Sequence, residues 1–238
     1  MIPLKDDVPS RSFPLITVLL IAMNVLAYFY QASLDFSQAG PAAGAGQAFM
    51  MEFGLVPCRL TGSCTLGGDF PSPTVTIFTS MFMHGSWFHV GGNMLYLWIF
   101  GDNVEDTLGH GRFAVFYLAV GVAAALAQVG LNAASRVPMV GASGAVSGVL
   151  GAYLLLFPYA RVLTLLIIGF FVRFVYVPAI IVLGFWIVVQ LINGFITFSA
   201  QSLGRGESGG VAWFAHVGGF LAGMLLLFLF RPRQSSRL

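Results

Sequence analysis

The sequence has few charged residues for its length. Asp, Glu, Lys and Arg make up only 8% of its 238 residues, whereas a soluble domain carries about a quarter. Hydrophobic residues make up 58%. So few charges cannot keep such an apolar chain in solution, which excludes an ordinary water-soluble globule and indicates a lipid environment. The net charge of +2 is too small to indicate nucleic-acid binding.

Apolar runs recur along the chain, and several approach or exceed the roughly 20 residues that span a bilayer. We expect six helices, at residues 14–31, 86–101, 113–131, 142–157, 178–198 and 211–230. Between them we expect a long outer loop at about 32–76, a short polar turn at 102–112, and a loop or interfacial segment at 159–177. The prediction is therefore an all-α membrane protein whose single domain, residues 1–238, contains six transmembrane helices.

The basic residues indicate how the chain is oriented. If both termini lie in the cytoplasm, only Arg59, Arg136 and Arg205 of the 11 Lys and Arg residues fall on the outer side. This distribution follows the positive-inside rule. Together with the compact chain and the lack of a targeting extension, it predicts a bacterial plasma membrane protein.

Cysteine is rare, with only Cys58 and Cys64, both in the predicted outer loop. A disulfide could persist there, but the sequence leaves open whether the two thiols are bridged or free. We expect no metal site, because the pair has no histidine nearby to complete a ligand set.

Polar residues at membrane depth are costly and therefore mark candidate sites. The first is Gly141-Ala142-Ser143-Gly144, at the predicted start of the fourth helix. Backbone N–H groups are unpaired at a helix N-terminus, and beside Ser143 they could stabilise a developing oxyanion. The same pattern also fits a serine N-cap with packing glycines.

The second candidate is His216, near the predicted start of the sixth helix. A neutral histidine can take a proton from a serine hydroxyl. Gly219 and Gly223 follow at the four-residue spacing that lets two helices pack tightly. Glycines with the same spacing occur in the fourth helix, so close packing would bring Ser143 and His216 together. Alternatively, His216 bonds a loop carbonyl.

The third candidate consists of His84, His89 and Asn93, at the entry to the second helix. His89 and Asn93 are four residues apart and share one helix face. Both could donate hydrogen bonds to an oxyanion, or they could form a polar clamp between helices. We expect His84 to brace the loop; a metal site formed by His84 and His89 is the weaker alternative, since no carboxylate joins them at zinc-motif spacing.

The three candidates share one depth in the six-helix arrangement. The second, fourth and sixth helices would all run inward, so Ser143, His216, His89 and Asn93 would all lie in outer first turns. No Asp or Glu falls at that depth, which excludes a Ser-His-Asp triad and predicts a Ser–His dyad. Glu105 would lie at the inner side, where we expect it to be a structural acceptor.

On these residues the sequence resembles the rhomboid family of intramembrane serine proteases. The resemblance covers about residues 78–223. It depends on four ordered elements: His84…His89…Asn93, Gly101…Glu105…Gly109, Gly141-Ala142-Ser143-Gly144, and Ala215-His216…Gly219…Gly223.

The resemblance implies a rhomboid-like bundle of six helices with a short, surrounded fourth helix. It implies that Ser143 attacks the scissile carbonyl, that His216 is the base and then the acid, and that His89, Asn93 and the Ser143 N–H hold the oxyanion. The substrates would be single-span membrane proteins cut in or near the bilayer, without a metal or cofactor. The helix at 178–198 and the segment at about 199–210 would act as gate and cap.

Two positions depart from the family pattern. Many rhomboids have a Trp-Arg pair in the first long loop, where this chain has Cys58-Arg59. Some have a tyrosine four residues after the nucleophile that stacks on the histidine, where this chain has Ser147. What orients His216 is therefore left open.

Other classes of membrane protein require residues that differ from those found here. Aspartyl, zinc and Ser/Lys intramembrane proteases need membrane carboxylates, an HExxH motif or a lysine near the site; the only lysine here is Lys5. The remaining alternatives are a catalytically inactive rhomboid-like protein that binds membrane clients, and a proton-linked transporter. Intact Ser143 and His216 argue against the first, and the lack of repeated helix pairs argues against the second.

Overall fold

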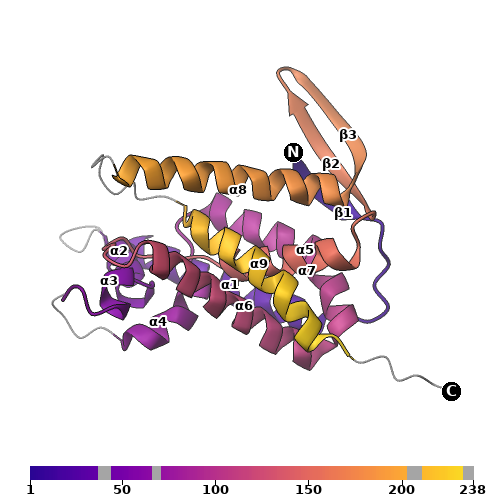
Figure 1. Ribbon diagram of the computed structural model, residues 1–238. Coiled ribbons are helices and arrows are strands. Elements are labelled where there is room, and N and C mark those ends of the chain that lie inside the picture. The colour runs from indigo at the N-terminus through magenta and orange to yellow at the C-terminus, as the bar shows by residue number, and fades with distance from the viewer. Residues whose placement is uncertain (37–43, 66–70, 203–210, 233–238) are drawn as a thin grey trace.

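The computed structural model describes residues 1–36, 44–65, 71–202 and 211–232, and these form a helical bundle with a small sheet at one end (Figure 1). The long helices are α1 (Leu15–Phe36), α5 (Trp87–Leu108), α6 (His110–Leu131), α7 (Ser143–Leu156), α8 (Ala179–Ser202) and α9 (Trp213–Phe230). The short ones are α2 (Ala45–Phe53), α3 (Pro57–Leu60), α4 (Pro73–Thr79) and the 3₁₀ turn η1 (Ser80–Phe82). The strands are β1 (Ile2–Asp6), β2 (Arg161–Ile168) and β3 (Phe171–Pro178).

The helices have the lengths and surfaces of an integral membrane protein. In the part of the chain that the structure describes, four are long and apolar enough to cross a bilayer: α1, α6, α8 and α9. Large apolar side chains on these helices are exposed, such as Leu26, Phe195 and Leu225, each about 70% accessible. Apolar surface of this kind on helices long enough to cross a bilayer is typical of contact with lipid.

Helix α7 is the short central element of the bundle. It has 14 residues, and every residue from Gly144 to Tyr153 is buried. Helices α5, α6 and α9 pack around it. A Cβ atom at Gly219 or Gly223 of α9 would lie within 3.0 Å of a backbone carbonyl of α7. This confirms the close glycine packing of these two helices that the sequence predicted.

The prediction of an all-α protein holds only in part: the described residues are mostly helical but include a three-stranded antiparallel sheet in the order β1-β2-β3. Residues 159–177, predicted as a loop or interfacial segment, contain most of a hairpin with a turn at Gly169 and Phe170. Alternating β-branched and aromatic residues favour strands there, and the left-handed backbone of Gly169 (φ +58°) permits the tight turn.

The polar turn predicted at residues 102–112 is also absent. Helix α5 continues to Leu108, and only Gly109, with a φ of +80°, separates it from α6. Two polar side chains of this segment bond the N-terminal segment: Asn103 donates to Asp6 of β1, and Asp102 accepts from Ser10. Residues 32–76, predicted as one long loop, include α2, α3 and the start of α4.

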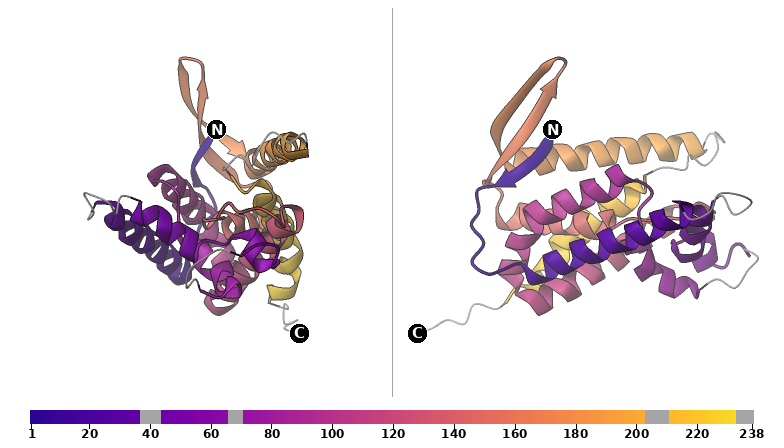
Figure 2. Two further views of the ribbon diagram at one scale, coloured as in Figure 1. Left: turned by 90° about the vertical axis from the view of Figure 1, so that its left-hand side faces the viewer. Right: turned by 180° about the vertical axis from the view of Figure 1, so that it is seen from behind.

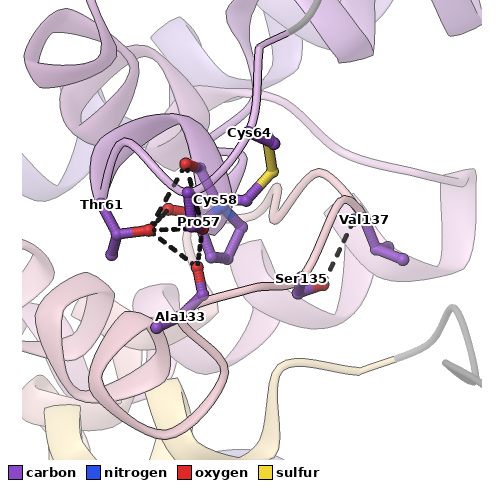
Figure 3. The surroundings of a disulfide bond; sticks show 8 residues. Pro57, Cys58, Thr61, Cys64, Ala133, Ser135 and Val137 are labelled. Carbon is purple, nitrogen blue, oxygen red and sulfur yellow. Dashed lines mark hydrogen bonds between the residues drawn. A yellow bond between two sulfur atoms is a disulfide. The ribbon is translucent and has the colours of Figure 1, made fainter.

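The segment around α3 is fastened to the chain just before α7. Cys58 and Cys64 are joined by a disulfide (Figure 3), so the structure has the bridged alternative. Inside the loop that it closes, the Thr61 hydroxyl donates to the Ala133 carbonyl at 2.9 Å. The Cys58 N–H donates to the Ser135 carbonyl at 3.0 Å. The segment leading to Ser143 is therefore held in place from outside the bundle.

Candidate active site

Ser143 and His216 lie together between α7 and α9. Ser143 is the first residue of α7, His216 lies in the first turn of α9, and Ser143 Oγ is 2.8 Å from His216 Nε2. The imidazole is 8% exposed. Ala142 is the N-cap residue of α7, and no side chain caps the helix. The geometry therefore fits a hydroxyl–imidazole pair better than a serine cap.

The other imidazole nitrogen of His216 contacts α8. His216 Nδ1 lies 2.7 Å from Gln190 Oε1. An amide oxygen can only accept, so Nδ1 carries the hydrogen and the Nε2 lone pair is free to accept from Ser143. The Trp186 ring lies beside the imidazole, with ring centroids 5.9 Å apart. Ser147 does not reach the imidazole but donates to the Ser143 carbonyl.

Sequence reasoning missed Gln190, although a signal existed. Gln190 is an amide in the middle of an apolar run, where a polar group is costly. The signal is ambiguous, because Asn193 one turn later is also an amide in the same run. Asn193 merely bonds the Val189 carbonyl of its own helix, at 2.8 Å. Only the packing of α8 against α9 distinguishes the two.

His84 holds the groups next to Ser143 in place. Its Nε2 lies 2.9 Å from Asn93 Nδ2, and the Ala142 N–H donates to the same nitrogen at 3.4 Å. Burial lowers the pKa of His84 to about 3, so this ring is neutral and its one Nε2 lone pair is available as an acceptor. The Gln31 amide of α1 donates to the His84 carbonyl at 2.7 Å and fixes the loop. Asn93 is thus oriented by a second histidine.

His89 lies directly against the chain before Ser143. A Cβ atom at Gly141 would be 2.8 Å from His89 Nε2 and 3.5 Å from Ser143 Oγ. Gly141 also has a φ of +128°, so a glycine is required for two separate reasons. The Gly85 N–H donates to His89 Nδ1 at 3.4 Å. His89 Nε2 is then the protonated nitrogen, on the side that faces Gly141.

Two cavities meet at the serine and the histidine. The larger one has a volume of about 690 Å³ and extends from Ser143 and His216 past Met139 and Val211. The smaller one, of about 200 Å³, lies between α5 and α8 and is lined by Tyr96 and Gln190, among others. Both include Ser143, His216 and His89. A reacting group can therefore approach Ser143 from two directions.

Glu105 lies away from this site and fastens α1 to α5 and α6. Its carboxylate accepts from the backbone N–H groups of Ile16 and Thr17, both at 2.8 Å, and from the Thr17 hydroxyl at 2.7 Å. His110 Nδ1 contacts the same carboxylate. A carboxylate at the first turn of α1 satisfies N–H groups that the helix cannot pair.

We expect Glu105→Ala to lower the free energy of unfolding by about 1–3 kcal/mol, because it leaves hydrogen-bond donors of α1 without an acceptor. Glu105→Gln keeps one acceptor oxygen and should lose less. Thermal unfolding of both variants in detergent micelles checks this order. Equal midpoints for Glu105→Ala and the unsubstituted protein would contradict the role of Glu105 in fastening α1.

The fold and the site define an integral membrane protein with a partly buried serine–histidine pair reached by two cavities. Residues 72–233, more than half of the chain, match the Rhomboid domain family model. The chain therefore belongs to the rhomboid family. Within the described residues, no group of three or more His, Cys, Asp and Glu side chains lies close enough to hold a metal ion.

Curated relatives come from bacteria and eukaryotes. The chain is 36% identical over 99 residues to Rhomboid protein 1, mitochondrial, of Saccharomyces cerevisiae, covering 40% of this chain and 29% of the relative. It is 36% identical over 143 residues to Rhomboid protease GluP of Bacillus subtilis, covering 56% and 27%. It is 32% identical over 159 residues to RHOMBOID-like protein 1 of Arabidopsis thaliana, covering 66% and 35%. The matches thus span about a third or less of these relatives.

Proposed function

We propose that this protein is an intramembrane serine endopeptidase that cuts membrane-protein substrates in or near their transmembrane segments. The observation that carries the proposal is the 2.8 Å contact between Ser143 Oγ and His216 Nε2 at the junction of two cavities inside an apolar bundle. A hydroxyl that hydrogen-bonds a neutral imidazole is an activated nucleophile. The relative named as a rhomboid protease supports the same reaction class.

The reaction follows from the positions of the groups. Ser143 Oγ attacks the scissile carbonyl and its proton passes to His216 Nε2. The negative charge moves to the carbonyl oxygen, which the Ser143 N–H, Asn93 and His89 stabilise. His216 then gives its proton to the leaving nitrogen, and the peptide bond breaks to leave an acyl group on Ser143. Water from the larger cavity, deprotonated by His216, hydrolyses that ester.

Helices α5 and α7 complete the proposed set of spans. With α1, α6, α8 and α9 they give six crossings in one membrane domain, in which α5, α7 and α9 start at the same end. The basic residues favour a plasma membrane with both termini in the cytoplasm. In this orientation, water would reach the site from the outer side of the membrane. Helix α8 and the segment at about 199–210 would act as gate and cap; residues 203–210 lie outside the described residues.

Single-span membrane proteins are the proposed substrates. The cavity between α5 and α8, of about 200 Å³, reaches Ser143 and His216 and is the place where we propose the scissile segment enters. The test is cleavage of a panel of purified single-span proteins in vesicles, with the cut sites mapped by mass spectrometry. Cuts within or next to the span support the proposal, and cuts confined to soluble domains contradict it.

A fluorophosphonate probe separates this function from the main alternative, a protein that binds membrane clients without cutting them. The probe modifies activated serines covalently. Labelling of Ser143 together with substrate cleavage supports the protease. Client binding with neither labelling nor cleavage would support the inactive alternative.

We expect Asn93→Ala to slow cleavage by about 10²–10³, the usual loss for one oxyanion donor. The substitution also removes the partner of His84, so circular dichroism and thermal unfolding must show that the fold persists. His84→Asn is the companion variant, because it disturbs the orientation of Asn93 while leaving the Asn93 amide in place. An unchanged turnover number for Asn93→Ala would remove Asn93 from the oxyanion site.

A further inference from the structure

Gln190 is the only side chain among the described residues that bonds the nitrogen of His216 facing away from Ser143. It is 7% exposed, whereas Leu191 and Ile192, the next residues of α8, are more than half exposed on the surface that faces lipid. A buried amide without a partner costs free energy. The 2.7 Å contact with His216 Nδ1 satisfies its oxygen.

We propose that Gln190 is a positioning residue that keeps His216 in the Nδ1–H tautomer, as a carboxylate does in a Ser-His-Asp triad. This inference deepens the proposed function and depends on it. If Nδ1 lost the hydrogen, Nε2 would carry it and could not accept the Ser143 proton. Gln190 thus selects the tautomer that can act as a base, without bringing a charge into the bundle.

A neutral acceptor and a charged one predict different kinetics. Gln190→Leu removes the acceptor at similar volume and should slow acylation of Ser143 about tenfold, the worth of one hydrogen bond, with little change in KM. Gln190→Glu restores an acceptor and adds a negative charge, which favours the protonated imidazole. The neutral base then forms only at higher pH, so the acidic limb of the pH–rate profile should shift upward.

The experiment compares three variants in the full-length protein. Gln190→Leu and Gln190→Glu test the contact, and Asn193→Leu is the matched control, because Asn193 is an amide of the same helix that donates to the Val189 carbonyl of its own backbone. Two measurements are made on each: the rate of fluorophosphonate labelling as a function of pH, and the ¹⁵N NMR signals of His216, assigned by comparison with His216→Ala.

The proposal expects a single Nδ1–H tautomer in the unsubstituted protein and Asn193→Leu, and a mixture in Gln190→Leu. Labelling should be slow in Gln190→Leu and normal in Asn193→Leu. An unchanged tautomer together with unchanged labelling in Gln190→Leu would overturn the role of Gln190. If the tautomer changes but even the unsubstituted protein is never labelled, the positioning stands and the proposed function fails.

A second feature is the apolar face of the β2–β3 hairpin, most of which is exposed toward the turn. The cross-strand pairs Leu163–Tyr176, Leu165–Phe174 and Ile167–Val172 lie on this face. The β3 residue of each pair is 57–65% exposed. The outer part of the hairpin, toward its turn, extends beyond the helices (Figures 1 and 2). A face of this kind is unstable in water.

We propose that this face lies on an anionic lipid surface, at the end of the bundle where β1 begins. Open strand edges do not occur in the hydrocarbon core, and the outer edge of β3 is unpaired in the described sheet. The hairpin therefore belongs in the interface, with its apolar face toward the acyl chains. Arg173, on the opposite face, and Arg161, at the base, are exposed and complement anionic headgroups.

Neighbouring positions on β3 provide the test. Val172→Cys on the apolar face and Arg173→Cys on the opposite face are spin-labelled in turn, since Cys58 and Cys64 are bonded to each other. The protein is placed in vesicles of phosphatidylcholine with or without phosphatidylglycerol, and collisions with oxygen and with a water-soluble nickel chelate are measured. The label at 172 should favour oxygen and the label at 173 the nickel chelate.

The lipid composition tests the contribution of charge. Deeper immersion at position 172 in vesicles with phosphatidylglycerol supports attraction by the arginines, and equal depth in both vesicles overturns it. Equal nickel accessibility at positions 172 and 173 would place the whole hairpin in water and overturn the proposed lipid contact.

Discussion

Replacing Ser143 by alanine should reduce cleavage of a transmembrane substrate by about 10⁴–10⁶ and abolish fluorophosphonate labelling. In the proposed mechanism the Ser143 hydroxyl, 2.8 Å from His216 Nε2, forms the acyl intermediate. Its removal would leave the proposed oxyanion donors without that nucleophile. His216→Ala should have an effect of the same order, because the two groups act as one unit and their losses do not add.

Ser147→Ala is the matched control for this prediction. Ser147 lies one turn further along the same helix and its hydroxyl bonds the Ser143 carbonyl, so the variant removes a buried hydroxyl without removing the nucleophile. It should still be labelled. The thermal midpoint of Ser143→Ala should stay near that of the unsubstituted protein. Labelling that persists in Ser143→Ala would assign the nucleophile to another residue.

The sequence was sufficient to identify Ser143 and His216 as candidates because their neighbours are glycines at helix spacing. Gly219 and Gly223 predicted that two helices approach closely, and close approach sets the relative depth of the groups at their ends. That reasoning used residues local to each helix. Such reasoning succeeds for helices whose packing can be predicted from the residue spacing within the helix itself.

The contacts that the sequence did not predict join distant parts of the chain. Gln190 and His216 are 26 residues apart, and Glu105 and Thr17 are 88 residues apart. Polar residues such as Asp102 and Asn103 indicated a solvent-exposed turn, yet they bond the N-terminal segment and extend α5 instead. A polar residue in an apolar helix indicates that it has a polar partner, but it does not identify that partner.

The hairpin was missed for a related reason. Arg161 and Arg173 marked residues 159–177 as outside the hydrocarbon core. The alternation of Leu163, Leu165 and Ile167 on one face was the available signal for a strand. Short apolar runs fit a strand and a helix equally well by composition, and the partner strand β1 lies more than 150 residues earlier.

The second large effect is expected from Gly219→Val. A Cβ atom at this position would lie within 3.0 Å of the Gly144 carbonyl oxygen, which belongs to the backbone of α7 and cannot rotate away. The substitution must therefore push α9 from α7 and lengthen the Ser143–His216 contact. A misplacement of about 1 Å in a reacting pair can cost about 10²-fold in rate. We expect a loss of that size or larger.

Graded variants show whether distance is the cause. Gly219→Ala should lose less activity than Gly219→Val, and Gly184→Val on α8 should lose none, since a Cβ at Gly184 meets no atom within 4 Å. Turnover is measured on protein that elutes as a single folded species in detergent. Cross-linking of cysteines introduced into α7 and α9 at their inner ends reports the separation independently of activity. Full turnover in folded Gly219→Val would mean that the meeting of hydroxyl and imidazole does not depend on glycine packing between α7 and α9.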